Sequence, residues 1–437
     1  MYRWFLALRY LLQRPINLLG MFGVMLSVWA LLVVVSIFSG YIVEVRQHIR
    51  ATTADVSVFG LPLDSSFERL RKVIDADPNV LTSAPRMAWV GLLHPTAPSS
   101  TPPAMTANSA IGEDSRFVHL VGIDPRAELQ VSGLTGWLAA VEDQALRIAP
   151  DALLQPSGAL PSLLLSERRL ALEGLRPGHS VRVTCARMHQ GAGQNLEADD
   201  LDLAVQGAFA SKYVLFDAST AFVHIDTLRK LLAAETADAC NVVAVQLRDP
   251  STDAATAQRL TRALEHELGH GVYVQNWEQT NATFLSAVDH QRALMKLVLF
   301  VIMVVAAFLM FATLSMMVTE KINDIGILTA MGANRRGVLQ VFLTCGMAIA
   351  AVGTVLGILL GCLSAIYLDD FNNWMRASFD IDLFPTTIYN LKRVPHDLDP
   401  VWIGQVALMA MGVSMVVSGL PAWRAARHDP IASLRED

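Results

Sequence analysis

The residues best suited to catalysis form the sequence HELGH, in which His266 and His270 flank Glu267. This sequence matches H-E-x-x-H, a pattern in which two histidines one helical turn apart bind zinc and the glutamate activates a water molecule. Taken by itself, the motif predicts a zinc hydrolase. Such a site also needs a third ligand and a helix that presents both histidines on one face.

The surrounding sequence argues against a zinc site. An extended metzincin motif would continue with Gly at 273 and His at 276, where Tyr273 and Asn276 stand. The nearest downstream acids, Glu278 and Asp289, have no helical context that would make either a third ligand. Gly269, soon followed by the β-prone VYV, indicates that the helix ends there and that the histidines leave one face. We therefore interpret HELGH as a coincidence and assign neither catalytic nor metal-binding residues.

Other cofactor and ligand patterns are absent from the sequence. No G-x-x-x-x-G-K-[ST] phosphate loop is present, so no ATPase motif is found in this chain. The net charge of -6, without a basic stripe, argues against nucleic acid as a partner. Cys345 and Cys362 fall within an apolar run, whereas Cys185 and Cys240 lie in the polar middle of the chain. Those two could pair in an oxidising compartment, and the sequence leaves this open.

Long apolar runs organise the chain. Of its 437 residues, 53% are hydrophobic and only 17% are charged, too apolar for an ordinary soluble protein and too polar for a chain lying wholly in a membrane. Four runs exceed the roughly 20 residues that cross a bilayer as a helix. Lys and Arg residues follow the second and fourth runs, and the positive-inside bias places both termini in the cytoplasm. The predicted spans are residues 15–43, 291–319, 338–368 and 401–423.

The remaining segments follow from these spans. On the cytoplasmic side we expect an interfacial helix, a loop and a tail, at residues 1–14, 320–337 and 424–437. On the outer side we expect a loop at residues 369–400 and a large domain at residues 44–290. The predicted fold class is therefore an α-helical membrane protein with four transmembrane helices and a large α+β extracytoplasmic domain between helices 1 and 2.

The outer domain alternates strand and helix patterns. Short β-rich runs predict strands: ADVSVF, RFVHLVGI, SVRVTCARM, NVVAVQL and VYVQNW. Apolar residues at helical spacing predict helices in FERLRKVIDA, IDTLRKLLAA and AQRLTRALEHEL. Two stretches rich in small and polar residues, 94–103 and 191–200, are predicted to be loops.

The cytoplasmic loop 320–337, EKINDIGILTAMGANRRG, contains a short helical pattern. Ile325, Leu328 and Met331 recur at three-residue spacing and would form one apolar face. Asn323 or Asp324 can cap the start of this helix, and Gly332 can stop it. A short amphipathic helix at a membrane surface needs a partner for its apolar face.

The third span carries glycines at a fixed interval. Gly353, Gly357 and Gly361 repeat every four residues and therefore lie on one helical face. Small residues at this spacing allow a second helix to approach closely in a membrane. We expect this face to be a helix-packing surface.

The loop EKINDIGILTAMGANRRGVLQVF, the tail PAWRAARHDPIASLR and the large outer domain together resemble the FtsX/MacB-type ABC transporter permeases. Within them the chain is most similar to the lipoprotein-releasing (LolC/LolE-type) permeases. LRYLLQR before the first span, VGIDPRAEL at 121–129, LLLSERRLALEGLRPGHSVRV at 163–183 and GAFASKYVLFDASTAFVHI at 207–225 carry this closer similarity.

The resemblance implies a non-catalytic permease in the bacterial inner membrane, with a MacB-like periplasmic domain at residues 44–290. It implies an ABC ATPase in a separate chain, which binds ATP and Mg, and a second permease, either identical or homologous. The loop helix would transmit nucleotide-driven closure to the periplasmic domain. The expected ATPase-coupling residues are Glu320, Asp324, Ile325, Gly326, Leu328, Met331 and Gly332.

For lipoprotein-releasing members, the resemblance implies that an acylated lipoprotein is extracted from the membrane and handed to a periplasmic carrier. Alternatives are an FtsX-like signalling permease that activates a periplasmic hydrolase, MacB-like efflux and, from HELGH alone, a membrane zinc protease. The large size of the outer domain favours transport over signalling. The sequence leaves open the cargo, the carrier and whether the two permeases are identical.

Overall fold

The computed structural model describes residues 16–95, 116–156, 158–188, 196–269, 271–322, 327, 334–379 and 397–427. The chain divides into two compact units. A helical unit contains the chain up to Val43 and most of the chain from Ser286 onward. An α+β unit contains Glu44–Leu285.

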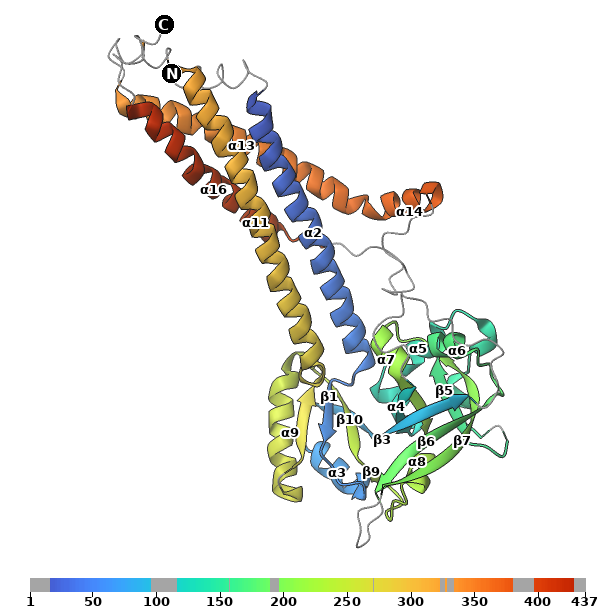
Figure 1. Cartoon of the computed structure of the whole chain (residues 1–437). Helices are drawn as coiled ribbons and strands as arrows, with labels where there is room; N and C mark the ends of the chain where they lie inside the picture. Colours follow the sequence, from blue (N-terminus) through green and yellow to red (C-terminus); the bar gives the residue numbers. More distant parts are fainter. Residues whose placement is uncertain are drawn as a thin grey trace. The chain divides into compact units, whose positions relative to one another are not determined.

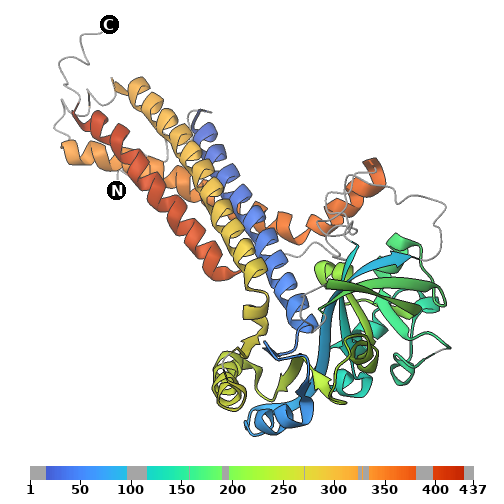
Figure 2. The same ribbon diagram turned by 60° about the horizontal axis from the view of Figure 1, so that its bottom comes forward.

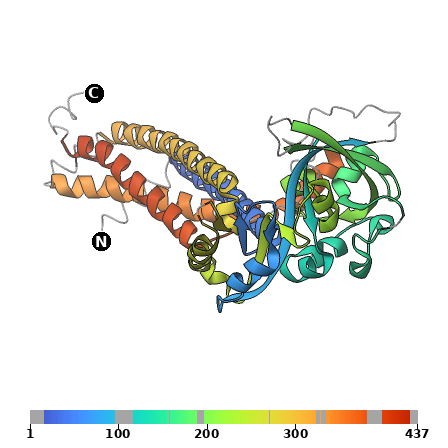
Figure 3. The ribbon, with the colours of Figure 1, turned by 90° about the horizontal axis from the view of Figure 1, so that it is seen from below.

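Among the described residues, four long helices build the helical unit, and each is long and apolar enough to cross a membrane. α2 and α11 run side by side, and α13 packs closely along α16 (Figures 1 and 3). A shorter helix, α14 (Leu368–Phe379), follows α13 after Tyr367. The four long helices are α2 (Ile16–Thr52), α11 (Ala282–Glu320), α13 (Arg335–Ile366) and α16 (Pro400–Arg427).

The bundle is apolar both inside and outside. Its exposed faces carry large apolar side chains such as Phe308, 72% exposed, and Val416, 75% exposed. Helices that are apolar all round are typical of membrane spans, because lipid takes the place of water at their surface. This arrangement confirms the predicted four-span membrane protein. The interior is formed by residues from all four helices, including Val28, Leu32, Met310, Phe342 and Val406.

The α+β unit is built on one nine-stranded sheet with the strand order β11-β1-β10-β3-β4-β8-β5-β7-β6. β6 also pairs with β3, so the six strands from β3 to β6 close into a barrel. Outside the barrel, β10, β1 and β11 extend the sheet from β3. The strands are β1 (Val56–Phe59), β3 (Val80–Pro95), β4 (Phe117–Ile123), β5 (Ser162–Ser166), β6 (Ser180–Met188), β7 (Leu196–Phe209), β8 (Thr220–His224), β10 (Val242–Leu247) and β11 (Tyr273–Asn276).

Short helices and one small ribbon surround this sheet. β2 (Ser65–Ser66) and β9 (Ala239–Cys240) pair with each other. Three 3-10 turns, η1 (Gln144–Leu146), η2 (Pro150–Ala152) and η3 (Pro250–Thr252), connect longer elements. The helices are α3 (Phe67–Ile74), α4 (Pro125–Val131), α5 (Leu134–Ala139), α6 (Glu167–Glu173), α7 (Val214–Ser219), α8 (Ile225–Leu231), α9 (Asp253–Leu268) and α10 (Trp277–Thr280).

The α+β unit has two large apolar cores. One fills the barrel and includes Met87, Leu120 and Val183. The other lies where α3 and α9 pack on strands β1, β10 and β11, through Ile74 and Leu260 among others (Figure 2). Strands β1 and β10 are buried at three consecutive positions each, so both of their faces are covered.

The observed elements match most of the predicted ones in this unit. Strands β1, β4, β6, β10 and β11 and helices α3 and α8 lie in the predicted runs, and α9 contains its predicted run but begins earlier, at Asp253. Both loop predictions are partly wrong. β3 extends to Pro95, into the predicted loop 94–103, and β7 begins at Leu196, within the predicted loop 191–200. Helix α14 occupies the start of the segment expected to be the outer loop 369–400.

The cysteines of the α+β unit, Cys185 and Cys240, are free thiols in the structure. Cys185 and Cys240 are both buried, in the barrel core and in the α3/α9 core respectively. Burial raises the pKa of the Cys185 thiol to about 11 and that of Cys240 to about 12. Thiols held protonated in this way are unreactive at neutral pH.

Candidate functional site

Helix α9 carries HELGH at its C-terminal end. The helix ends at Leu268, and Gly269 follows as its C-cap with φ of 81°. This left-handed value favours glycine, which explains why the helix ends there. His266 and Glu267 are both exposed in the last turn. His270 lies outside the described residues.

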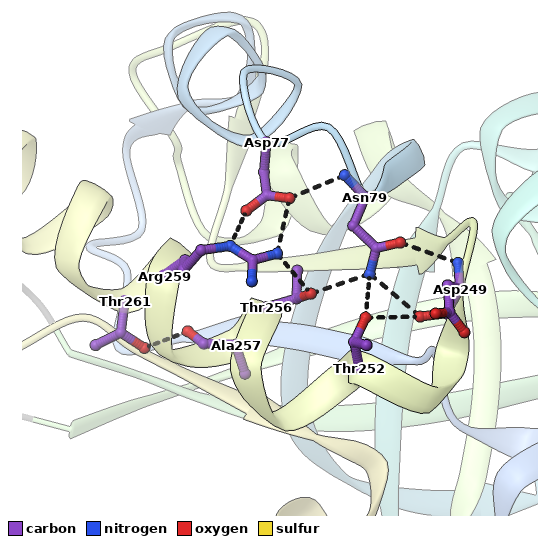
Figure 4. Close-up of polar contacts among 8 residues, drawn as sticks. All are labelled: Asp77, Asn79, Asp249, Thr252, Thr256, Ala257, Arg259 and Thr261. Carbon is purple, nitrogen blue, oxygen red and sulfur yellow. Dashed lines mark hydrogen bonds and ion pairs between the residues drawn. The ribbon is translucent and has the colours of Figure 1, made fainter.

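The N-terminal half of α9 is tied to the turn that precedes β3. Arg259 forms a two-point ion pair with Asp77, with Nε to Oδ2 at 2.8 Å and Nη2 to Oδ1 at 3.1 Å (Figure 4). The hydrogen bonds from Arg259 hold the pKa of the Asp77 carboxyl below its usual range. Arg259 also donates to the hydroxyl of Thr256, which is fully buried. This pair fixes α9 against the adjacent turn.

Asn79 completes the tie between the β3 turn and α9. Its side-chain Nδ2 donates to the hydroxyls of Thr252 and Thr256, each at 3.0 Å. Its Oδ1 accepts from the backbone N of Asp249 at 2.9 Å (Figure 4). One amide side chain therefore satisfies donors and acceptors on both sides of the loop that leads into α9.

The geometry around HELGH gives α9 a packing role. Across the described ranges, no group of three or more His, Cys, Asp or Glu side chains is placed to hold a metal ion. Leu260 and Leu264 are buried on the sheet-facing side of α9, whereas His266 and Glu267 follow in the exposed last turn. The apolar residues of α9 thus account for the position of this helix.

The expected coupling loop connects α11 to α13. Glu320 is exposed and is the last residue of α11. At the other end, Asn334 caps α13 by accepting a hydrogen bond from the backbone N of Arg336 at 3.3 Å. Within the loop, Ile327 is 51% exposed. The other proposed coupling residues lie outside the described residues: Asp324, Ile325, Gly326, Leu328, Met331 and Gly332.

The three glycines of α13 lie against α2. A Cβ atom at Gly353 would lie 2.9 Å from the carbonyl oxygen of Met21, and one at Gly357 would lie 2.8 Å from that of Met25. At Gly361 it would lie 3.0 Å from the Cβ of Leu32. Contacts this short leave no room for a side chain, so the backbones of α2 and α13 approach closely along this face.

A polar contact lies along the same pair of helices. The indole Nε1 of Trp29 in α2 donates to the hydroxyl of Ser364 in α13 at 2.9 Å. Interhelical hydrogen bonds of this kind contribute about 0.6 kcal/mol each in membrane bundles. Most of the attachment between α2 and α13 therefore comes from close packing.

Sequence reasoning missed the aromatic surface of α14. Phe371, Trp374 and Phe379 form a chain with centroid separations of 5.8 Å from Phe371 to Trp374 and from Trp374 to Phe379. All three side chains are about half exposed or more. The signal was present in the sequence, because aromatic residues that directly follow a span are typical of the membrane interface.

A family model of the FtsX-like permease C-terminal region matches residues 296–430. This range starts in α11 and includes the whole of α13, α14 and α16. It also contains the loop 320–337 and the glycine face of α13.

Full-length relatives extend the similarity to the α+β unit. The chain is 27% identical over 425 residues to the lipoprotein-releasing system transmembrane protein LolC of Xylella fastidiosa (strain 9a5c), covering 96% of this chain and 94% of that protein. It is 24% identical over 441 residues to LolC of Neisseria meningitidis serogroup B (strain MC58), covering 98% of each chain.

Similarity to MacB proteins is partial. The chain is 25% identical over 198 residues to the macrolide export ATP-binding/permease protein MacB of Neisseria meningitidis serogroup A (strain Z2491), covering 45% of this chain and 28% of that protein. Among solved structures, the periplasmic region of MacB from Actinobacillus actinomycetemcomitans aligns with a TM-score of 0.33 and 11% identity, covering 55% of this chain and 97% of that chain.

Proposed function

The chain belongs to the FtsX-like permeases, and from this premise we propose that it is the membrane subunit of an ABC system that releases lipoproteins. The observation that carries the proposal is the similarity to LolC proteins along 96% of the chain, which includes the α+β unit as well as the spans. In the proposed cycle, a separate ATPase hydrolyses ATP and moves the periplasmic domain. The cargo is an acylated lipoprotein that passes to a periplasmic carrier.

We propose that the protein lies in the bacterial inner membrane with both termini in the cytoplasm. The distribution of basic residues supports this orientation, since Lys321, Arg335 and Arg336 flank the loop between α11 and α13. The α+β unit would then face the periplasm. A second permease, identical or homologous, would complete the complex.

The loop 320–337 is the proposed contact with the ATPase. Glu320 ends α11 and Asn334 caps α13, so the loop is attached at both ends to long helices that cross the membrane. A push on the loop therefore acts on two spans at once. In the proposed contact, Ile325, Leu328 and Met331 enter a groove on the ATPase, with Asp324, Gly326 and Gly332 shaping the helix that carries them.

MacB-like efflux remains the second candidate, favoured by the partial match to a macrolide export protein. The two functions differ in cargo. Reconstitution with the partner ATPase in nanodiscs distinguishes them: lipoprotein release requires an acylated protein and a soluble carrier, whereas efflux predicts stimulation of ATP hydrolysis by a macrolide. ATP-dependent activation of a hydrolase, with neither cargo moved, would instead indicate a signalling permease.

The substitution Met331→Asp tests the coupling contact. A carboxylate placed in an apolar groove is buried without a partner, at a cost of several kcal/mol. We expect the ATPase to be lost on co-purification while the abundance of the permease in the membrane stays at the wild-type level. The matched control is Arg336→Gln, which removes a charge outside the apolar face and should retain the ATPase. Wild-type co-purification and cargo-stimulated ATP hydrolysis in Met331→Asp would refute the coupling role.

The zinc-protease alternative is tested with the same preparation. We expect no stoichiometric zinc in the purified chain, and we expect Glu267→Gln to retain full lipoprotein release. The reason is the position of His266 and Glu267 in the exposed last turn of a helix that ends at Leu268. Bound zinc at one equivalent, together with loss of activity in Glu267→Gln, would establish the hydrolase instead.

A further inference from the structure

A charged pocket lies within the helical unit where α2, α11 and the start of α16 meet. It has a volume of about 250 Å³ and is lined by Ser39, Arg292, Lys296, Asp397, Asp399 and Trp402 among others. A water molecule takes about 30 Å³ in the liquid, so the pocket has room for a group much larger than a single water. None of these residues belongs to the proposed coupling loop.

The pocket lies at the depth of lipid headgroups. Lys296 is the last charged residue of α11 before Glu320, and the uncharged run between them is roughly 34 Å long at about 1.5 Å per residue, close to the thickness of the hydrocarbon core. In α2 the uncharged run reaches Val43, and in α16 it begins after Asp399. The three helices therefore contribute to the pocket at the same end of their apolar runs.

Opposite charges line this pocket without neutralising each other. Arg292 and Lys296 are exposed and stand one helical turn apart on α11. Within the described part of the chain, neither cation lies within ion-pair distance of a carboxylate. Asp399 uses one carboxylate oxygen to cap α16, accepting from the backbone N of Val401 at 2.9 Å. The backbone N of Asp397 donates to the carbonyl oxygen of Ser36 at 3.1 Å, which holds this acid beside α2.

Trp402 supplies an aromatic wall and an unused donor. The Nζ of Lys296 lies 5.8 Å from the centroid of its ring, within range of a cation–π contact that keeps the ammonium group at the pocket. The indole Nε1 of Trp402 is buried and has no acceptor in the described structure. A buried donor without an acceptor costs about 1–3 kcal/mol, so a ligand that brings an oxygen acceptor into this pocket would be stabilised.

We propose that this pocket binds the headgroup of a zwitterionic phospholipid from the outer leaflet. The phosphodiester lies against Arg292 and Lys296, and the amine lies toward Asp397 and Asp399. Lipid is favoured over a soluble phosphate because exposed apolar side chains, including Leu297 and Val401, adjoin the pocket and provide a surface for acyl chains. A bound lipid would join the outer ends of α2, α11 and α16. This proposal rests on the membrane spans and on the proposed orientation, and not on the identity of the cargo.

The test measures lipid retention by the full chain purified in mild detergent, with native mass spectrometry as the readout. We expect phosphatidylethanolamine to be retained in preference to phosphatidylglycerol, whose headgroup has the phosphate but no amine. In Arg292→Ala/Lys296→Ala, retention of phosphatidylethanolamine should fall at least tenfold. The matched control, Lys72→Ala/Arg262→Ala, removes two cations from the α+β unit and should retain the lipid.

Two single substitutions test the pocket if the double substitution misfolds. Lys296→Arg retains the positive charge and should keep the lipid, and Asp397→Asn should reduce the preference for phosphatidylethanolamine over phosphatidylglycerol. Unchanged retention in Arg292→Ala/Lys296→Ala, or equal retention of the two lipids by the wild-type chain, would overturn the proposal. If soluble phosphoethanolamine is retained by the purified chain as well as phosphatidylethanolamine is, the proposal would also be overturned, because the site would then recognise a water-soluble ligand.

Discussion

The α+β unit and the helical unit bury polar groups in different ways. Among the described residues, the buried charged side chains are Glu128, Arg169 and Asp217, and all three belong to the α+β unit. In the helical unit, the buried hydroxyl of Thr313 bonds within its own helix, to the carbonyl oxygen of Leu309 at 2.8 Å, whereas those of Ser36 and Thr354 have no partner in the described structure. Water can solvate the charged side chains of the α+β unit before folding buries them, whereas the lipid around the bundle offers no hydrogen-bonding partner. Cohesion in the bundle therefore depends on close approach of backbones.

The largest effect is expected at the buried ion pair between β3 and α4. Glu128 is 1% exposed and accepts a hydrogen bond from Nε of Arg86 at 3.0 Å. Glu128→Ala leaves the Arg86 guanidinium without its partner, so we expect the free energy of unfolding of the α+β unit to fall by about 3–5 kcal/mol. Urea denaturation of the full chain in detergent measures this change.

The control for this prediction is an exposed pair in the same unit. Asp226 accepts from Arg229 at 2.9 Å, and its side chain is 55% exposed. Asp226→Ala should cost less than about 1 kcal/mol, because solvent screens the pair. If Glu128→Ala and Asp226→Ala lower the free energy of unfolding equally, then burial does not make the Arg86–Glu128 pair more important for stability than the exposed pair.

The next effect concerns the pH dependence of the same unit. Burial raises the pKa of the Asp217 carboxyl from 3.8 to about 6, although hydrogen bonds from Ser211 and the backbone oppose this rise. The folded state therefore binds more protons than the unfolded state between these two values, and stability falls as pH rises from about 4 to 6. A difference of about 2 in pKa corresponds to roughly 3 kcal/mol at most.

Asp217→Asn removes this titration and keeps an oxygen acceptor for Ser211. We expect the substitution to flatten the decline in the free energy of unfolding between pH 4 and 6, as followed by urea denaturation at a series of pH values. Asp202→Asn serves as the control, since this carboxyl is exposed and the hydrogen bond from Arg182 lowers its pKa. A decline that survives in Asp217→Asn would show that another group causes it.

The two units also differ in how much of their structure the sequence predicted. The spans were predictable because each is a long apolar run, and a run of about 20 residues or more is what a helix needs to cross a membrane. In the α+β unit, short β-rich runs predicted five of the strands, but β5 has the sequence SLLLS, which is buried at every position and contains neither alternation nor β-branched residues. The strand residues 196–200 fall within the stretch 191–200, which the sequence predicts to be a loop because it is rich in small and polar residues. Arg182 and Thr184 of β6 bond to Asp202 and Asp200, their direct partners on the adjacent strand β7, which makes a polar strand stable there.

The candidate sites were predictable to different degrees. Regular spacing was enough to predict a shared face for Gly353, Gly357 and Gly361, but it could not name α2 as the helix they meet. The pocket around Arg292 and Trp402 was not predicted, because its residues come from three helices far apart in the sequence. A single sequence contains periodicity within one element, whereas the pairing of elements depends on tertiary packing.

The smallest of the expected effects tests the close approach of backbones in the bundle. A Cβ atom at Gly357 would lie 2.8 Å from the carbonyl oxygen of Met25 and 2.8 Å from the Cβ of Val28, so Gly357→Ala forces α2 and α13 apart. We expect a loss of about 1–3 kcal/mol, the usual cost of overpacking. The melting temperature of the full chain in detergent measures it.

Gly412 of α16 provides the matched control, since a Cβ atom there would meet nothing within 4 Å. Gly412→Ala should leave the melting temperature unchanged or raise it slightly, because alanine has a higher helix propensity than glycine. Gly357→Ala should lower it. If both substitutions shift the melting temperature equally, then close approach along the glycine face contributes nothing specific, and the bundle must depend on the contacts of its larger side chains. A selective loss in Gly357→Ala would instead support cohesion by backbone proximity in the helical unit, in contrast to the buried charges that stabilise the α+β unit.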